Sequence, residues 1–268
     1  MAHAPLPVLD RRRFGETLRR DAWWLPNLPV VGILTAFVVY ATWAAFQNGH
    51  YTFGPYLSPF YSPELLGDSP HAWFGPKPAG WPGWLPFSPA LLILPIPALF
   101  RFTCYYYRGS YYKAFWADPP GCAVGEPRKT YLGERYFPLV LQNLHRYGLL
   151  ASLIVWFILV YDAYRAFWFA DATGTGTTFG MGVGSLVLLL NVVMLGGYLF
   201  GCHSARHVLG GLRDAISTAP VRQLAYDCSS CLNRAHSRWA WASLFTVAFS
   251  DIYIRLCSMG VWTDARLF

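Results

Sequence analysis

Long runs of apolar residues alternate with polar, basic or Pro/Gly-rich connections along most of the chain. Five runs are long enough to cross the roughly 30 Å hydrocarbon core of a bilayer as helices. They cover residues 29–46, 87–107, 139–169, 182–208 and 238–260. The second run contains Pro95 and Pro97, which predict a kink. The pattern predicts an all-α integral membrane protein, in which a cytoplasmic or interfacial segment (1–28) precedes a transmembrane domain (29–268).

The composition supports this fold class. Of the 268 residues, 54% are hydrophobic and only 13% are charged, whereas soluble domains carry about 25% charged residues. The mean hydropathy is positive, at +0.29. Aromatic residues make up 18% of the chain, which suits belts at two membrane–water interfaces. Disorder, coiled coil and a small disulfide scaffold are therefore excluded.

The basic residues predict an orientation. With the N-terminus inside, 17 of the 21 Lys and Arg fall in inner segments, and only Lys77, Arg165, Arg255 and Arg266 lie outside. Positive residues accumulate on the cytoplasmic side of membrane proteins. The asymmetry predicts an N-in, C-out arrangement, and it accounts for the net charge of +7 without nucleic acid as a partner.

The connections differ in character. Residues 48–86 are rich in Pro, Gly and aromatics and predict a compact cap at the outer interface. Residues 170–181 look like a plain Gly/Thr turn. The two inner loops, 108–138 and 209–237, are basic and carry Tyr, Cys and His, so we expect a partner or chemistry there.

Five of the six Cys and four of the seven His fall at the inner face: Cys104, Cys122, His145, Cys202, His203, His207, Cys228, Cys231 and His236. His203 and His207 stand at i, i+4 on one helical face, and Cys228 and Cys231 form a CxxC pair. Two thiolates with two imidazoles suit a Rieske-type [2Fe–2S] centre or a structural zinc. Alternatively, the thiols are a redox-inert or disulfide-capable pair and the imidazoles are polar residues at headgroup level.

Charged residues also occur inside the predicted helices. Asp162 and Arg165 lie near the outer end of one, and Asp251 and Arg255 lie in the outer half of another. We expect pairing across these helices, because it lowers the cost of insertion. A role with protons or a quinone headgroup is the second interpretation.

Asn191, followed by Gly196 and Gly197, predicts close helix packing. The chain has no HExxH, GxSxG, Walker loop or GxGxxG, each of which would indicate a catalytic or nucleotide site. The sequence therefore favours an anchor and electron conduit over a complete enzyme.

Several unusual segments together resemble one family. They are Tyr56–Pro63 (YLSPFYSP), Arg101–Arg108 (RFTCYYYR), Pro119–Pro127 (PPGCAVGEP), Gln142–Tyr147 (QNLHRY), Cys202–His207 (CHSARH) and Cys257–Asp264 (CSMGVWTD). The chain resembles the single-chain membrane anchor of the actinobacterial, mycobacterial-type succinate dehydrogenase (the type 1 enzyme). The likeness covers nearly the whole chain.

The resemblance implies a multi-pass subunit of the bacterial plasma membrane. It implies that flavoprotein and iron–sulfur subunits bind on the cytoplasmic side and that electrons pass to menaquinone. A small additional anchor subunit and a higher oligomer are further expectations. Docking of the iron–sulfur subunit is expected on the basic inner loop, through Arg108, Lys113, Arg128, Lys129 and Arg135.

The resemblance also implies a cofactor. Many relatives in the wider superfamily hold haem b, whereas the mycobacterial branch is associated with a membrane-embedded Rieske-type [2Fe–2S] cluster. The preferred ligand set is His203, His207, Cys228 and Cys231. Cys104, Cys122, Cys202, His145 and His236 are reserves.

Residues near the inner face are the candidates for binding the quinone headgroup, which needs hydrogen-bond donors beside an apolar cavity. They are His145, Arg146, Tyr147, Tyr105 and Arg108, with Trp239 and Trp241 along the same wall. Two rivals stay open. One is a haem b cytochrome with His145 and either His203 or His207 as axial ligands. The other is a non-redox membrane protein that binds zinc or nothing.

Overall fold

The computed structural model describes residues 20–115, 135–137, 139–171, 176–211 and 214–268. The chain divides into two compact units. One unit comprises residues 1–39 and 101–145, and the other comprises residues 40–100 and 146–268.

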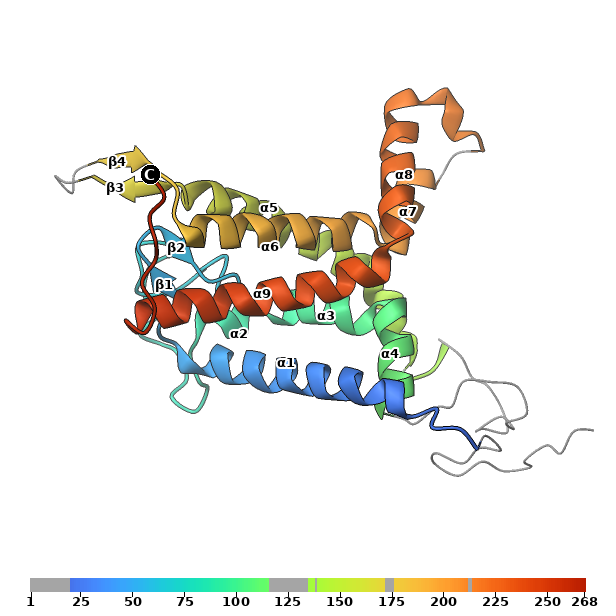
Figure 1. Cartoon of the computed structure of the whole chain (residues 1–268), viewed down its shortest axis with the longest axis horizontal. Coiled ribbons are helices and arrows are strands. Elements are labelled where there is room, and N and C mark those ends of the chain that lie inside the picture. The colour runs from blue at the N-terminus through green and yellow to red at the C-terminus, as the bar shows by residue number, and fades with distance from the viewer. Residues whose placement is uncertain (1–19, 116–134, 138, 172–175, 212–213) are drawn as a thin grey trace, which may run out of the picture. The chain divides into compact units, whose positions relative to one another are not determined.

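Helices dominate the described residues (Figure 1). The α-helices are α1 (Leu28–Gln47), α2 (Pro89–Ile93), α3 (Pro95–Thr103), α4 (Tyr105–Phe115), α5 (His145–Arg165), α6 (Val183–Phe200), α7 (His203–Gly210), α8 (Pro220–Asn233) and α9 (His236–Ser258). Short 3-10 turns are η1 (Leu25–Asn27), η3 (Leu139–Leu144) and η4 (Ile216–Thr218). Two small antiparallel hairpins pair β1 (Thr52–Phe53) with β2 (Tyr56–Leu57), and β3 (Trp168–Ala170) with β4 (Thr177–Phe179).

Four helical segments of the described chain are long and apolar enough to cross a membrane. They are Leu25–Gln47, Val140–Arg165, Val183–Phe200 and His236–Ser258. These four match the first, third, fourth and fifth predicted runs. The prediction of an all-α multi-pass membrane protein is therefore confirmed.

The second predicted helix, 87–107, does not form one continuous helix. The run of helical hydrogen bonds is interrupted after Leu94, directly before Pro95, although Leu94 itself keeps helical backbone angles (φ −56°, ψ −31°), and α3 and α4 are separated at Cys104. Proline lacks the N–H that would bond back to the preceding turn, and its ring clashes there. The predicted kink is therefore present as a break between α2 and α3, and the expected single span is three short helices.

The fourth predicted helix, 182–208, is also divided. Helix α6 ends at Phe200, Cys202 has extended backbone angles (φ −70°, ψ 144°), and α7 starts at His203. Side chains from α8 take the carbonyls that a continuous helix would have used: Ser229 Oγ donates to the Phe200 carbonyl at 2.6 Å, and Asn233 Nδ2 donates to the Gly201 carbonyl at 2.7 Å. Contacts from distant residues thus end this helix.

The connection at 170–181 is more ordered than a plain turn. Strands β3 and β4 pair within it, with Phe169 opposite Thr178. The C-terminal tail joins this region, because the Leu267 N–H donates to the Met181 carbonyl at 2.7 Å and the Val183 N–H donates to the Ala265 carbonyl at 3.1 Å. The tail is therefore fixed beside the start of α6.

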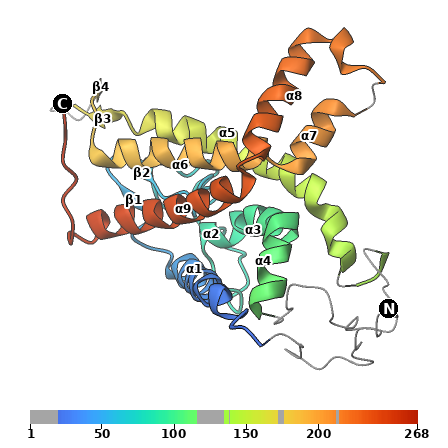
Figure 2. The same ribbon diagram turned by 45° about the vertical axis from the view of Figure 1, so that its right-hand side comes forward.

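Helix α6 runs between α5 and α9 (Figures 1 and 2). A Cβ atom on Gly197 would lie 2.4 Å from the Trp239 ring, and one on Gly196 would lie 3.1 Å from the Trp156 ring. Because glycine leaves room for both indole rings, Trp239 of α9 and Trp156 of α5 pack directly on α6. The predicted packing role of these two glycines is confirmed.

Tyr56 lies at the centre of the buried core near the other end of these helices. Its hydroxyl donates to Asp264 Oδ2 at 2.7 Å, and Tyr253 donates to Asp264 Oδ1 at 2.7 Å. The Gly184 N–H, in the first turn of α6, also donates to Asp264 Oδ1, at 2.9 Å. One tail carboxylate thus joins the 48–86 segment to α6 and α9.

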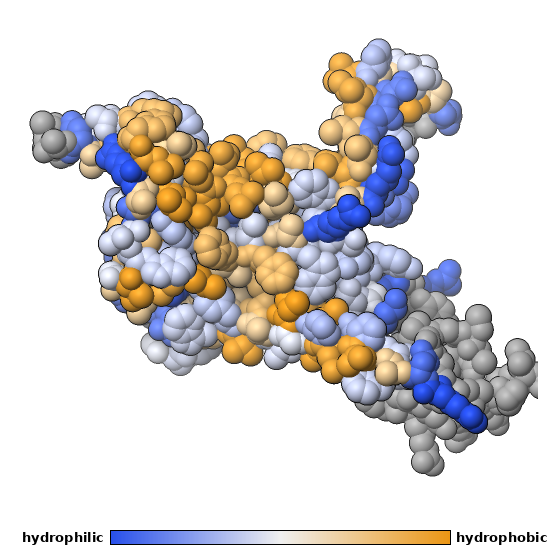
Figure 3. Space-filling model, in the orientation of Figure 1, coloured by the Kyte–Doolittle hydropathy of each residue, from blue (hydrophilic) through white to orange (hydrophobic). Residues whose placement is uncertain are grey.

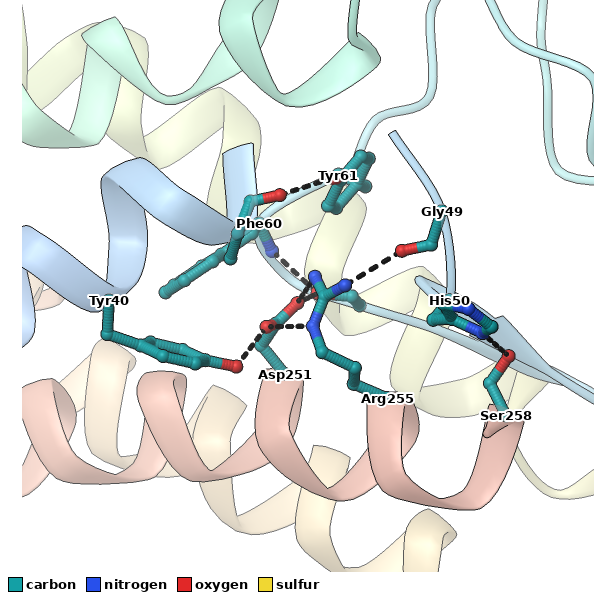
Figure 4. A network of polar contacts seen from close by, with 10 residues as sticks. Tyr40, Gly49, His50, Phe60, Tyr61, Asp251, Arg255 and Ser258 are labelled. Carbon is teal, nitrogen blue, oxygen red and sulfur yellow. Dashed lines mark hydrogen bonds and ion pairs between the residues drawn. The ribbon is translucent and has the colours of Figure 1, made fainter. Parts of the chain in front are cut away.

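Asp251 and Arg255 form an ion pair within α9, with Nε 3.3 Å from Oδ2, one helical turn apart. The expected structural ion pair is therefore present, but Asp251 and Arg255 pair within one helix and not across helices. Figure 4 shows what surrounds the pair: Tyr40 of α1 donates to Asp251 Oδ2 at 2.5 Å, and Arg255 Nη1 donates to the Gly49 carbonyl at 2.8 Å. These uncharged groups of α1 and the following loop satisfy the hydrogen bonds of the buried pair, so the pair needs no charged residue from another helix.

Candidate functional site

His145 is the first residue of α5, and its Nδ1 atom lies 2.9 Å from Thr103 Oγ1 at the end of α3. Both residues belong to the first unit. The hydrogen bond fixes the imidazole at a helix terminus, where a polar side chain can meet a ligand from the apolar phase. His145 thus lies at the start of α5, near one end of the apolar segment Val140–Arg165, with Thr103 as its hydrogen-bond partner.

Two Arg–Tyr pairs of the same unit involve tyrosines of α4, one within α4 and one with Arg101 of α3. The Arg108 guanidinium lies 4.5 Å from the centre of the Tyr105 ring, which is 74% exposed. Arg101 Nη1 donates to the Tyr107 hydroxyl at 2.9 Å. Burial raises the pKa of Tyr107, so this phenol stays neutral and serves the fold, whereas the Tyr105 ring is presented at the surface.

The remaining residues expected around a quinone belong to the second unit. Arg146 and Tyr147 are exposed in the first turn of α5. Trp239 packs on Gly197 of α6, and Trp241 contacts Phe245 with ring centres 6.4 Å apart. Trp239 is thereby assigned to helix packing. The expected quinone residues are not gathered within one unit.

His203 and His207 meet on the exposed side of α7. Their Nε2 atoms are 2.8 Å apart, a separation that two ligands of one metal ion can adopt, given metal–nitrogen bonds of about 2.0–2.1 Å. Loss of solvent around the ring lowers the pKa of His203, and the charges of His207 and Arg206 act in the same direction. A lowered pKa favours the neutral imidazole that binds metals.

The CxxC pair does not join these imidazoles. Cys228 and Cys231 are free and exposed on α8. Across the described part of the chain, no group of three or more His, Cys, Asp and Glu side chains is placed to hold a metal ion. The reserves Cys104 and Cys202 are buried, His236 stacks on Tyr198, and Cys122 lies outside the described residues. The four-ligand set therefore stays a prediction.

Two arginines that no sequence motif indicated hold α7 against α8. Arg206 donates to Ser230 Oγ at 3.1 Å and to the Tyr226 hydroxyl at 3.1 Å. Arg222 donates to the carbonyls at the end of α7, those of Val208, Leu209 and Gly211. These bonds satisfy the orphan carbonyls of a helix C-terminus. No local sequence pattern predicts these hydrogen bonds, because the partners lie 11 to 24 residues away in the chain.

The described fold is that of a helical integral membrane subunit, whose polar side chains gather at helix ends. Residues 25–260 match the family described as actinobacterial succinate dehydrogenase subunit SdhC. The chain belongs to this family and is a membrane anchor subunit of a succinate dehydrogenase complex.

A solved structure agrees with this assignment. The chain is similar to a chain of the Mycobacterium smegmatis Sdh1 complex in the apo form, with 40% sequence identity and a TM-score of 0.82. The match covers 94% of each chain. No curated protein sequence matches significantly. The family expected from the sequence segments is confirmed, as is the location in a bacterial membrane.

Proposed function

We propose that this subunit anchors flavoprotein and iron–sulfur subunits of succinate dehydrogenase to the membrane and binds the menaquinone that receives their electrons. The family match over residues 25–260 carries this proposal. Four apolar helices supply the anchor. The exposed Lys113 and Arg135, with Arg108, supply the described part of a basic docking face, while Arg128 and Lys129 lie outside the described residues. Complementary charge favours such docking.

Quinone reduction takes two electrons and two protons, so the headgroup needs hydrogen-bond donors at its carbonyl oxygens. His145 and Arg108 supply such groups in the first unit, and the exposed Tyr105 ring beside Arg108 offers a face for the quinone ring. Donors aimed at an oxygen that gains negative charge stabilise the reduced form. Residues on rigid helix ends are suited to hold this geometry.

A paired activity assay tests the quinone site. In the intact complex, His145→Gln or Tyr105→Leu should lower succinate oxidation coupled to a soluble menaquinone analogue. Oxidation coupled to a dye that accepts electrons from the soluble subunits should be unchanged. Tyr164→Leu, an exposed tyrosine on α5, is the matched control. If both substitutions leave the quinone reaction unchanged, the quinone binds elsewhere; if dye reduction also falls, the residues serve assembly.

We further propose His203 and His207 as the imidazole half of a metal centre, such as a Rieske-type [2Fe–2S] cluster. The 2.8 Å separation of the Nε2 atoms supports this half. The thiolate half is not supported, because Cys228 and Cys231 do not gather with the imidazoles. A [2Fe–2S] cluster with two imidazole ligands would supply one-electron transfer at a raised potential.

Metal and acid-labile sulfide analysis of the purified complex tests this second proposal. The clusters of the iron–sulfur subunit set a background of iron and sulfide, so wild-type and variant complexes are compared. His207→Ala should lower iron and sulfide by the content of one [2Fe–2S] cluster per complex and should remove a Rieske-type paramagnetic signal. A Soret band lost in His145→Ala would instead establish the haem b alternative, and loss of zinc alone in His207→Ala would establish a structural metal. If iron, sulfide and zinc are the same in both complexes, the imidazole pair is not a metal site.

A further inference from the structure

Helices α7 and α8 form a hairpin that stands across the axes of α6 and α9 (Figures 1 and 2). Helix α6 has 18 residues, which corresponds to about 27 Å at a rise of about 1.5 Å per residue. That length only just matches a hydrocarbon core of about 30 Å. Phe200, the last residue of α6, therefore lies at the boundary of the hydrocarbon.

Short connections keep the base of the hairpin at this boundary. Only Gly201 and Cys202 separate α6 from α7, and only Arg234 and Ala235 separate α8 from α9. In addition, Ser229 and Asn233 of α8 donate hydrogen bonds to the Phe200 and Gly201 carbonyls at 2.6 and 2.7 Å. The end of α8 thus touches the last turn of a membrane-spanning helix, at the depth of the membrane interface.

One side of α8 is apolar and uncovered. Val221 is 84% exposed and Leu224 is 72% exposed, and Cys228 and Cys231 are also exposed. Their spacing of i, i+3, i+7 and i+10 places them on a single stripe of the helix. In Figure 3 the hydrophobic residues of the hairpin lie along the edge facing back over the membrane-spanning helices, and strongly hydrophilic residues lie along its middle and far edge.

We infer that the α7–α8 hairpin is an in-plane membrane anchor. Its stripe of Val221, Leu224, Cys228 and Cys231 sits in the lipid interface. In-plane amphipathic helices bury such a stripe at the boundary of headgroups and acyl chains. Arg234 and Arg238, exposed beside the hairpin's base, reach anionic lipid headgroups, as long basic side chains do at this depth.

Lipid is favoured over a soluble subunit as the occupant because of depth. A stripe on a helix that touches the end of α6 meets acyl chains before it meets a protein in the cytoplasm. The inference also gives the CxxC pair a different role from the one that its spacing suggests: the thiols contribute apolar contact with lipid and do not ligate a metal.

Thiol modification of the native complex tests the inference without any substitution. Membrane vesicles that expose the hairpin side are treated with an uncharged, lipid-soluble maleimide or with a sulfonated, membrane-excluded one, and the Cys228/Cys231 peptide is followed by mass spectrometry. The uncharged reagent should modify both thiols. The sulfonated reagent should react about tenfold more slowly than it does after detergent removes the lipid, because charge is excluded from the apolar layer.

Two substitutions supply the control. The cysteine introduced by Leu224→Cys should react with the uncharged reagent and only slowly with the sulfonated one, as Cys228 should. The cysteine introduced by Arg234→Cys, at headgroup level, should react readily with the sulfonated reagent in intact vesicles. Equal reaction of Cys228 with both reagents in vesicles would place the stripe in water and overturn the inference. If Cys228 is protected from both reagents until the soluble subunits are stripped, a protein partner covers the stripe and the inference is overturned. If the protection ends when metal is chelated, the thiols ligate a metal and the inference is likewise overturned.

Discussion

The buried ion pair of α9 makes a quantitative prediction. Asp251 is fully buried and Arg255 is 4% exposed, and their closest atoms are 3.3 Å apart. At an effective dielectric constant of about 20, two unit charges at that distance attract by about 5 kcal/mol. In Asp251→Ala this attraction is lost while Arg255 stays buried, and removing one partner of a buried pair costs about 3–5 kcal/mol.

The loss should be local. Asp251 also accepts hydrogen bonds from Tyr40 of α1 and Ser58 of the following segment, and Arg255 donates to the Gly49 carbonyl. Because these bonds converge on one carboxylate, its removal should loosen the connection of α9 to residues 48–62. A cost of that size corresponds to about 10²- to 10⁴-fold less protection from amide exchange there, since about 1.4 kcal/mol is tenfold.

Hydrogen exchange of the purified complex, followed by mass spectrometry, measures this protection directly. Asp68→Ala, which removes an exposed carboxylate of the same 48–86 segment, is the matched control and should change protection by less than about tenfold, as surface substitutions do. Asp251→Leu combined with Arg255→Leu removes both charges and should restore part of the protection. If Asp251→Ala behaves like Asp68→Ala, the pair does not hold the loop, and the reasoning fails.

Three further substitutions have defined outcomes. Gly197→Ala places a Cβ atom 2.4 Å from the Trp239 ring and should cost about 1–3 kcal/mol by overpacking, seen as a lower unfolding temperature; Gly32→Ala, with open space around it, should be neutral. Asp264→Ala leaves the Gly184 N–H and two tyrosine hydroxyls without their acceptor, so α6 exchange at its first turn should rise. Burial lowers the pKa of His71, so the unfolded loop binds a proton more readily. Protection of the 48–86 segment should therefore fall as the pH drops below about 6.5, and His71→Gln should remove that dependence.

The hydrophobic pattern was sufficient to predict the spanning helices, because a bilayer leaves few alternatives for a long apolar run. Residues 29–46 and 238–260 agree closely with α1 and α9. The breaks at Leu94 and Cys202 have different origins. The first follows from Pro95 and was predictable as a kink. The second depends on Ser229 and Asn233, which are 27 or more residues away, so no local pattern could reveal it.

The candidate site was predicted as far as it depends on local spacing. His203 and His207 meet because i, i+4 positions adjoin on any helix, and their hydrogen bond confirms that geometry. Whether Cys228 and Cys231 approach this imidazole pair depends instead on which side of α8 faces α7, and in the described structure they do not approach it. That rotation is determined by Arg206, Ser230 and Tyr226, which appeared as ordinary polar loop residues in the sequence.

The break at Gly201–Cys202 connects the fold to both proposals for the hairpin. Had α6 continued to residue 208, as its composition predicts, His203 and His207 would extend along the membrane normal, away from the bilayer. Because the chain turns instead, the imidazole pair and the thiol pair lie on helices that cross the end of α6 (Figure 2). All four side chains then stay near the membrane boundary, on different faces of one hairpin. The same turn that makes the imidazoles accessible to a metal at this depth thus exposes the thiols to lipid.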